Sequence, residues 1–202
     1  MSLRLTEALE VSLKLSQHLF KSHFMIFTET EIKGAFIIDM TPIQDERGFF
    51  GRTFCEKEFA EAGLETKYVQ ANASRSRDQY TLRGMHYQTN GHEEVKVIRC
   101  VRGKIQDVII DLRPESPTYC QHIKVDLSED NKRMLYVPRG FAHGFLSLVP
   151  DCEVAYMVSA AYSPQNERAV RWDDPLFNIE WAAEPKVVSD KDSKHENYVK
   201  LG

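Results

Sequence analysis

The sequence lacks the features of a membrane protein or of a nucleic-acid-binding protein. Its longest uninterrupted apolar stretches, such as residues 24–27 and 35–38, are far shorter than the ~20 residues that a bilayer-spanning helix needs. Lys and Arg number 26 against 30 Asp and Glu, so the formal net charge is −4. Without a basic surplus there is no global attraction for nucleic acid. We therefore expect neither a membrane nor a nucleic acid as a partner.

Cysteine is also scarce, and no C-x-x-C pair occurs. Cys55, Cys100, Cys120 and Cys152 are scattered along a chain that is long enough to fold without disulfides. We therefore predict free thiols in or near the core. The first residues alternate charged and apolar side chains, so no secretory signal is visible. This pattern predicts a cytoplasmic protein.

What is present is the composition of an ordinary globular protein, with 42% hydrophobic, 28% charged and 10% aromatic residues. The length of 202 residues is typical of one domain with a sizeable core. Residues 1–24 carry leucines at a spacing compatible with an amphipathic helix. We expect them to be an N-terminal extension and residues 25–202 to form one domain.

From Gly34 onward the sequence is rich in β-strand signals. Short runs with apolar residues are separated by turn residues such as Gly103 and Pro114, a pattern typical of a mainly β sandwich or barrel. One helix is expected at residues 55–63, and two tryptophans indicate that the last segment packs on the body. The ten runs cover residues 34–40, 48–54, 67–74, 81–88, 94–101, 104–112, 119–127, 133–138, 143–149 and 152–160.

Alternation along the strands places several ionisable side chains on the apolar face. Asp107, for example, shares a face with Ile105 and Ile109. Burying an unpaired charge costs several kcal/mol, so such groups must satisfy one another or face a wet cavity such as a barrel mouth. Each alone is most simply a structural residue, but together they indicate a functional cavity. The inward polar residues are His86, Lys96, Asp107, His143 and Tyr156.

One strand contains a conflict. Arg83 and His86 are three residues apart, so strict alternation places them on opposite faces. Gly84 lies between them, and a glycine inside a strand often marks a β-bulge that re-aims a side chain beside an active site. We expect such a bulge here.

Six ordered motifs resemble the RmlC-like family of nucleotide-sugar epimerases, the dTDP-4-dehydrorhamnose 3,5-epimerases. The resemblance runs from about residue 25 to residue 192. The motifs are D-x-R-G (Asp45–Gly48), V-Q-x-N (Val69–Asn72), L-R-G-x-H (Leu82–His86), R-G-x-x-x-D (Arg102–Asp107), G-F-A-H-G-F (Gly140–Phe145) and W-D-D-P (Trp172–Pro175).

The resemblance implies a cupin-type jelly-roll β-barrel with a few short helices, a homodimer that needs neither metal nor cofactor. It implies an isomerase of deoxysugar and polysaccharide biosynthesis that acts on a nucleoside-diphosphate 4-keto-6-deoxy sugar. Such an enzyme inverts C3, C5 or both by moving protons at the carbons beside the ketone.

The resemblance also assigns roles to residues at matching positions. His86 matches the catalytic base, and Asp192 matches the carboxylate that orients it. Lys96 matches the lysine near the keto oxygen, and Tyr156 the tyrosine that returns a proton from the other side. The segment 45–50 is expected to reach the partner subunit's site. The positions expected to contact substrate are Arg47, Phe50, Arg52, Gln70, Asn72, Arg83, Asp107 and His143.

The chemistry of epimerisation beside a ketone also explains why these residue types are needed. A proton beside a carbonyl is weakly acidic, so its removal needs a base and a group that stabilises the enolate as it forms. His86 with Asp192 supplies the base, and Lys96 the positive charge. Inversion requires a second donor on the opposite face, such as Tyr156. Planar arginine forks suit the dianionic diphosphate.

Two positions depart from the family pattern. Arg52 stands where many members have a glutamate associated with reading the base, and the usual Q-D-N appears as Gln70-Ala71-Asn72. An arginine reverses the charge and hydrogen-bonding role of a carboxylate. The nucleotide is therefore open to being something other than dTDP.

Three other functions stay open at this stage. A related barrel ketoisomerase moves the keto group between C4 and C3 and has less need of Tyr156. A metal-dependent cupin oxygenase wants two histidines and a carboxylate, yet Tyr87 and Gln88 follow His86, with no H-x-H motif. A non-catalytic sugar-binding module does not require His86, Lys96 and Tyr156 together.

Overall fold

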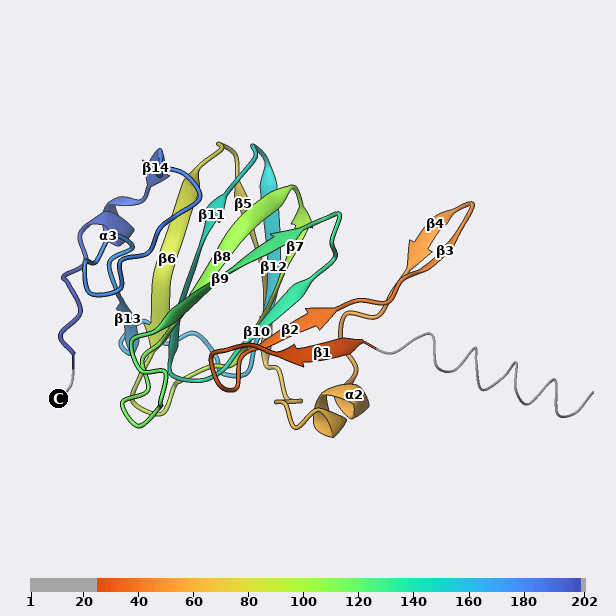
Figure 1. Cartoon of the computed structure of the whole chain (residues 1–202), viewed down its shortest axis with the longest axis horizontal. Helices are drawn as coiled ribbons and strands as arrows, with labels where there is room; N and C mark the ends of the chain where they lie inside the picture. The colour runs from red at the N-terminus through yellow and green to blue at the C-terminus, as the bar shows by residue number, and fades with distance from the viewer. Residues whose placement is uncertain (1–24, 201–202) are drawn as a thin grey trace, which may run out of the picture. The chain divides into compact units, whose positions relative to one another are not determined.

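The computed structural model describes residues 25–200, which divide into two compact units (Figure 1). The larger unit comprises residues 27–38 and 67–200, and the smaller one residues 25–26 and 39–66. The helix expected in residues 1–24 lies outside the described residues. No helix in the described range is long and apolar enough to cross a membrane.

The larger unit is built from two sheets, and the chain crosses between them several times (Figure 1). The first sheet has the order β1 (Ile26–Glu29), β2 (Phe36–Asp39), β10 (Met134–Val137), β7 (Lys96–Arg102), β12 (Cys152–Val158), β5 (Gln70–Ser76). The second has the order β13 (Glu167–Ala169), β6 (Thr81–Gln88), β11 (Phe141–Ser147), β8 (Lys104–Asp111), β9 (His122–Ser128), and β14 (Val187–Val188) pairs with β6.

The strands of this unit follow the jelly-roll order. β5, β7, β10 and β12 lie in one sheet and β6, β8, β9 and β11 in the other, with antiparallel pairing in each. The described residues hold only two short helices, α2 (Glu56–Glu61) and α3 (Asp190–Ser193). The mainly β, cupin-type jelly roll predicted from the sequence is confirmed.

The main core fills the space between the two sheets. Alternate residues of each strand point inward, as Ile105 and Ile109 of β8 do. The other face of β8 is also apolar and is covered by the segment that follows β13, including Phe177 and Trp181. The predicted packing of this segment is confirmed. The inter-sheet core includes Ile98, Cys100, Leu127, Leu135, Val137, Phe141, Phe145 and Val154.

The smaller unit contains the hairpin of β3 (Ile43–Asp45) and β4 (Gly48–Phe50), and helix α2. The expected strand at residues 48–54 is shorter than predicted, because only Gly48–Phe50 pairs, with β3. Glu58 of α2 is buried and accepts a hydrogen bond of 2.8 Å from the Met25 N–H. Arg52 forms an ion pair with the same carboxylate.

All four cysteines are free thiols, as predicted. Cys100 and Cys152 are buried in the inter-sheet core. Burial raises the pKa of the Cys100 thiol to about 12, so this sulfur stays protonated at neutral pH.

Candidate active site

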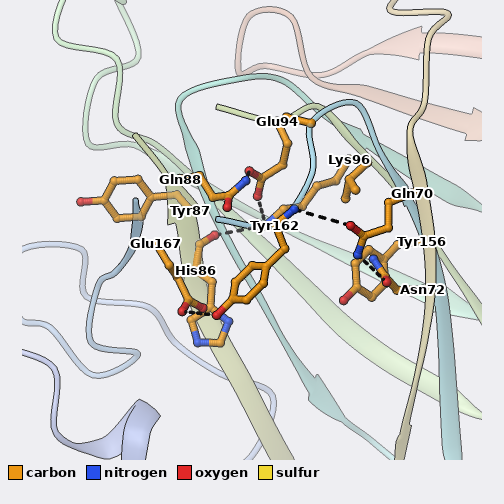
Figure 2. Close-up of a pocket in the computed structure, with 12 residues that line it drawn as sticks. Gln70, Asn72, His86, Tyr87, Gln88, Glu94, Lys96, Tyr156, Tyr162 and Glu167 are labelled. Carbon is orange, nitrogen blue, oxygen red and sulfur yellow. Dashed lines mark hydrogen bonds and ion pairs between the residues drawn. The ribbon is translucent and has the colours of Figure 1, made fainter. Parts of the chain in front are cut away.

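Two adjoining cavities open between the sheets, with volumes of about 360 Å³ and 460 Å³. Both are lined by His86, Lys96 and Tyr156, so these three side chains mark where the cavities meet. His86 comes from β6 in the second sheet, whereas Lys96 and Tyr156 come from β7 and β12 in the first. The barrel therefore brings together an imidazole, an ammonium and a phenol that are far apart in the sequence (Figure 2).

The His86 imidazole is paired with a buried carboxylate. Its Nε2 lies 2.7 Å from Oδ1 of Asp192, which is 106 residues away in sequence. The Asp192 side chain is 6% exposed and that of His86 31%, so the carboxylate lies behind the imidazole. Because an ionised carboxylate only accepts hydrogen bonds, the neutral form of this imidazole has its proton on Nε2 and its lone pair on Nδ1.

Helix α3 holds the carboxylate in place. Ser189 caps the helix by accepting a hydrogen bond of 3.1 Å from the Asp192 N–H, and the Gly84 N–H donates to Asp192 Oδ2 at 3.4 Å. Burial by itself raises the pKa of Asp192, but the hydrogen bond and charge of His86, with the bonds from Gly84 and Ser189, outweigh it. The pKa therefore lies below its usual value, and Asp192 is ionised at neutral pH.

A β-bulge in β6 aims Arg83 and His86 into the same cavity, as expected from Gly84. In the pairing with β11, His86 lies opposite His143 and Arg83 lies opposite Phe145. The step is three residues on β6 and two on β11, so β6 has one extra residue. Both Arg83 and His86 line the second cavity. Gly84 has a φ of +122°, and a Cβ added there would lie 2.5 Å from the Gly144 Cα. Only glycine fits this position.

Lys96 is buried and paired. Its Nζ lies 3.1 Å from Oε1 of Glu94 and donates at 3.3 Å to the His86 carbonyl oxygen. Gln88 donates to Oε2 of Glu94 at 2.5 Å, so the carboxylate is itself held (Figure 2). An ammonium fixed at the His86 carbonyl, in the wall of both cavities, is well placed to stabilise negative charge that develops there.

Tyr156 lies across the first cavity from His86 (Figure 2). Burial raises the pKa of its phenol, and Arg83 opposes this only partly. The hydroxyl is therefore protonated at neutral pH and available as a proton donor.

A second acid–imidazole pair lies in the same barrel. Nε2 of His143 is 3.1 Å from Oδ2 of Asp107, and Asp107 is fully buried. Burial raises the pKa of Asp107, and His143 and Lys96 offset only part of this effect. His143 lines the second cavity beside Phe145.

The remaining predicted contact residues divide between the two units. Gln70 and Asn72 line the first cavity and are joined by a hydrogen bond of 2.8 Å, while Arg83 lines the second. Arg47 and Phe50 belong to the β3–β4 hairpin of the smaller unit, where Phe50 is 71% exposed. The roles of Arg47, Phe50 and Arg52 stay predictions.

Sequence reasoning missed several residues of this site. Glu94 lies two positions before Lys96, a spacing that could have indicated a shared face. Tyr162 and Glu167 also line the first cavity, and the Tyr162 hydroxyl donates to Glu167 Oε2 at 2.9 Å. His195 lies near His86, with ring centroids 6.3 Å apart. The sequence around His195 contains no motif or periodicity that would have predicted its closeness to His86.

Taken together, the jelly roll and a cavity holding a paired base, an ammonium and a phenol define a cupin-type barrel equipped for proton transfer. Residues 29–199 match the family model of dTDP-4-dehydrorhamnose 3,5-epimerase. The chain therefore belongs to the dTDP-4-dehydrorhamnose 3,5-epimerase family, and the resemblance inferred from its motifs is confirmed.

Curated relatives and solved structures agree with the family match. The chain is 41% identical over 172 residues to dTDP-4-dehydrorhamnose 3,5-epimerase of Shigella flexneri, covering 85% of this chain and 94% of that one. It is 42% identical to the Methanothermobacter thermautotrophicus enzyme, covering 82% and 90%. The structure superposes on the Bacillus anthracis epimerase, solved with TDP and PPi bound, with a TM-score of 0.84 at 38% identity, covering 87% and 100%.

Proposed function

We propose that this protein is an epimerase of a nucleoside-diphosphate 4-keto-6-deoxy sugar, of the dTDP-4-dehydrorhamnose 3,5-epimerase type. The observation that carries the proposal is the joint presence of the His86–Asp192 pair, Lys96 and Tyr156 in one cavity of a chain from this family. A structure of the Legionella pneumophila relative, 37% identical with a TM-score of 0.79, contains dTDP-4-keto-L-rhamnose.

The reaction begins with removal of a proton from a carbon beside the ketone. His86 donates Nε2–H to Asp192, which leaves the Nδ1 lone pair to accept the proton. The imidazolium that forms is stabilised by the ionised Asp192 carboxylate. The electron pair of the broken C–H bond moves onto the keto oxygen, and the product of this step is an enolate.

Lys96 stabilises that enolate. The developing negative charge on the keto oxygen meets a buried ammonium, whose attraction is stronger in the low-dielectric cavity than in water. Glu94 holds Nζ at 3.1 Å and so fixes its position. A fixed charge needs no reorganisation as the enolate forms.

Inversion is completed from the opposite side of the sugar. Tyr156, from the other sheet, donates its phenolic proton to the carbon that His86 deprotonated. Its raised pKa keeps the proton available at neutral pH. Because donor and base lie on opposite walls, the new C–H bond forms on the opposite face.

The nucleotide diphosphate is held by the polar residues around the two cavities. Gln70, Asn72 and Arg83 supply donors there, and a planar arginine fork matches phosphate geometry. His143, held by the buried Asp107, supplies a further polar contact from the wall of the second cavity. Arg47 and Phe50 complete the set from the partner subunit of a homodimer, and Arg52 stands at the position associated with reading the base.

The proposal leaves three features as predictions. The enzyme acts in the cytoplasm and without a cofactor, and residues 25–202 form its epimerase domain after an extension at 1–24. The number of inverted centres is decided by experiment, since one solved structure similar to this chain, at 30% identity, is that of ChmJ, a 3'-monoepimerase from Streptomyces bikiniensis. Arg52 leaves the nucleotide base to be tested as well.

Solvent deuterium exchange tests the proposal. The protein is incubated in deuterated water with dTDP- and other nucleoside-diphosphate 4-keto-6-deoxy sugars, and the label is located by NMR and mass spectrometry. We expect label at C3, C5 or both, and a loss of about 100-fold or more in the His86→Ala variant, the range for removing a general base. Nucleotide binding should survive the substitution.

A His92→Ala variant serves as the control, because His92 is an exposed histidine outside both cavities. Exchange by His86→Ala at the wild-type rate would show that another group is the base. Transfer of the keto group to C3 without label at C5 would identify a ketoisomerase instead.

A further inference from the structure

A third side chain lies beside the His86–Asp192 pair. The imidazole ring of His195 is 6.3 Å from that of His86, centroid to centroid, with the ring planes at 82°. The His195 Nε2 is buried and has no hydrogen-bond partner among residues 25–200. A buried ring nitrogen without a partner costs free energy, so it indicates a ligand at this point.

The three residues offer a set of metal-ligand atoms. Each of the three residues His86, Asp192 and His195 offers one donor atom, and these atoms lie within 4.8 Å of one another. No other group of this kind occurs in the described part of the chain. Two imidazoles and a carboxylate are donors that suit zinc and similar divalent ions. Tetrahedral zinc, with bonds of about 2.0–2.2 Å, needs donor atoms about 3.4 Å apart. The donor atoms must therefore approach one another by at most about 1.4 Å when an ion binds.

The fold supports these donors from two directions. Asp192 lies in α3, and His195 follows two residues after Ser193, the last residue of this helix, so one short segment supplies both. His86 faces them from β6, with its Nε2 already 2.7 Å from Asp192 Oδ1. Because His86 and Asp192 also line the second cavity, a bound ion keeps an open coordination position toward that cavity.

We propose that His86, Asp192 and His195 form a binding site for a divalent transition-metal ion of the zinc type, and that occupancy inactivates the catalytic base. The ion binds the Nε2 lone pair of His86, and the single ring proton moves from Nε2 to Nδ1. No proton is lost overall. Nδ1 then has no lone pair to accept a proton from the sugar, so proton transfer stops.

Calorimetric titration of chelator-treated full-length protein with zinc chloride tests the site directly. We expect one zinc ion per wild-type chain and at least about a tenfold lower affinity for His195→Ala, since that change removes a ligand outright. The His92→Ala variant, which lacks an exposed histidine outside the cluster, should bind zinc like the wild type. Magnesium, which prefers oxygen ligands, should not bind.

The deuterium-exchange assay tests the inactivation. Zinc should inhibit exchange by the wild-type protein and leave the exchange rate of His195→Ala almost unchanged relative to that variant's own rate without zinc. Zinc affinity in His195→Ala equal to that of the wild type, or equal inhibition of both proteins, would overturn the proposal. Calorimetry does not depend on the sugar, so a protein that exchanged no sugar at all would refute the proposed function and leave this result intact.

Discussion

At the scale of single residues, Asp107 is a side chain whose burial is only partly compensated by its neighbours. Its carboxyl is fully buried, and its pKa is raised by burial against the partial opposition of His143 and Lys96. A raised folded-state pKa means that the carboxylate form disfavours folding. This penalty is absent below the unfolded pKa of about 3.9 and grows as the pH rises through the folded value.

We therefore predict that Asp107→Asn increases the free energy of unfolding at pH 7 and lowers sugar exchange. The amide keeps the shape and an acceptor for His143 but cannot ionise. Urea denaturation at pH 7 and at pH 3.5 measures the effect, which should shrink at the lower pH. A variant that is less stable than the wild type at pH 7 would contradict this explanation.

Alternation and motif spacing predicted His86, Lys96 and Tyr156 as inward residues, because strand periodicity depends only on neighbouring residues and is visible in the sequence. The partners of these residues could not be deduced in the same way. His195 reaches the site only through tertiary packing, and no local pattern records which distant segment covers β6. For Asp192 the motif resemblance, and not periodicity, supplied the pairing.

At the scale of secondary-structure elements, the bulge in β6 is the feature on which the site geometry depends. We predict that Gly84→Ala destabilises the protein by more than about 3 kcal/mol and abolishes exchange, because its Cβ would meet the Gly144 Cα at 2.5 Å. Thermal unfolding and the exchange assay measure both effects.

Gly91→Ala is the matched control for the bulge. Gly91 also has a positive φ, of +81°, but a Cβ there meets nothing within 4 Å. Its cost should be the ordinary one for a left-handed residue, about 1–2 kcal/mol, with the active site intact. Equal losses in both variants would mean that backbone conformation, and not close packing against β11, explains the need for glycine.

The end of β8 contains a buried ion pair that predicts acid sensitivity. Asp111 is fully buried and accepts from Arg113 Nη2 at 2.7 Å, Ser116 Oγ at 2.5 Å and Thr118 Oγ1 at 2.7 Å. Burial alone would raise the pKa of Asp111, but these bonds outweigh it and the pKa is lowered. The stabilisation is therefore fully present above the unfolded pKa and is lost as the pH falls toward the folded one.

We predict that Asp111→Asn costs about 2 kcal/mol at pH 7, at the low end for a buried pair because the Arg113 side chain is 32% exposed. The difference from wild type should shrink as the pH falls below about 4. Chemical denaturation across this range measures it. A constant difference at every pH would show that the charge of Asp111 does not matter.

The longer strands of the barrel were predictable, since runs such as β6, β8 and β12 have seven or eight residues of clear β character. The short strands β13 and β14, of three and two residues, were not. Both form by pairing with the edge of β6, and this pairing depends on the assembled sheet. Helix α3, with four residues, is likewise too short to leave a periodic signal.

At the scale of the whole molecule, the proposed dimer makes a sharp prediction about shared sites. Sedimentation velocity should give twice the chain mass of 23.3 kDa. If residues 45–50 complete the partner subunit's site, co-refolding His86→Ala chains with Arg47→Ala chains should restore about a quarter of wild-type exchange. Half of the dimers that form contain one chain of each kind, and one of the two sites in such a dimer is intact. Activity no higher than that of Arg47→Ala alone would mean that each chain completes its own site.

The attachment of α3 to β6 has a consequence for biogenesis. β14 joins β6 through parallel pairing of Val187 with Thr81, and α3 then sets Asp192 behind His86. All eight jelly-roll strands precede this segment in the chain, so a nascent polypeptide can assemble its barrel while the imidazole still lacks its counter-ion. The His86–Asp192 pair can form only after translation has passed Asp192, so the catalytic base is completed later than the strands that carry the other site residues.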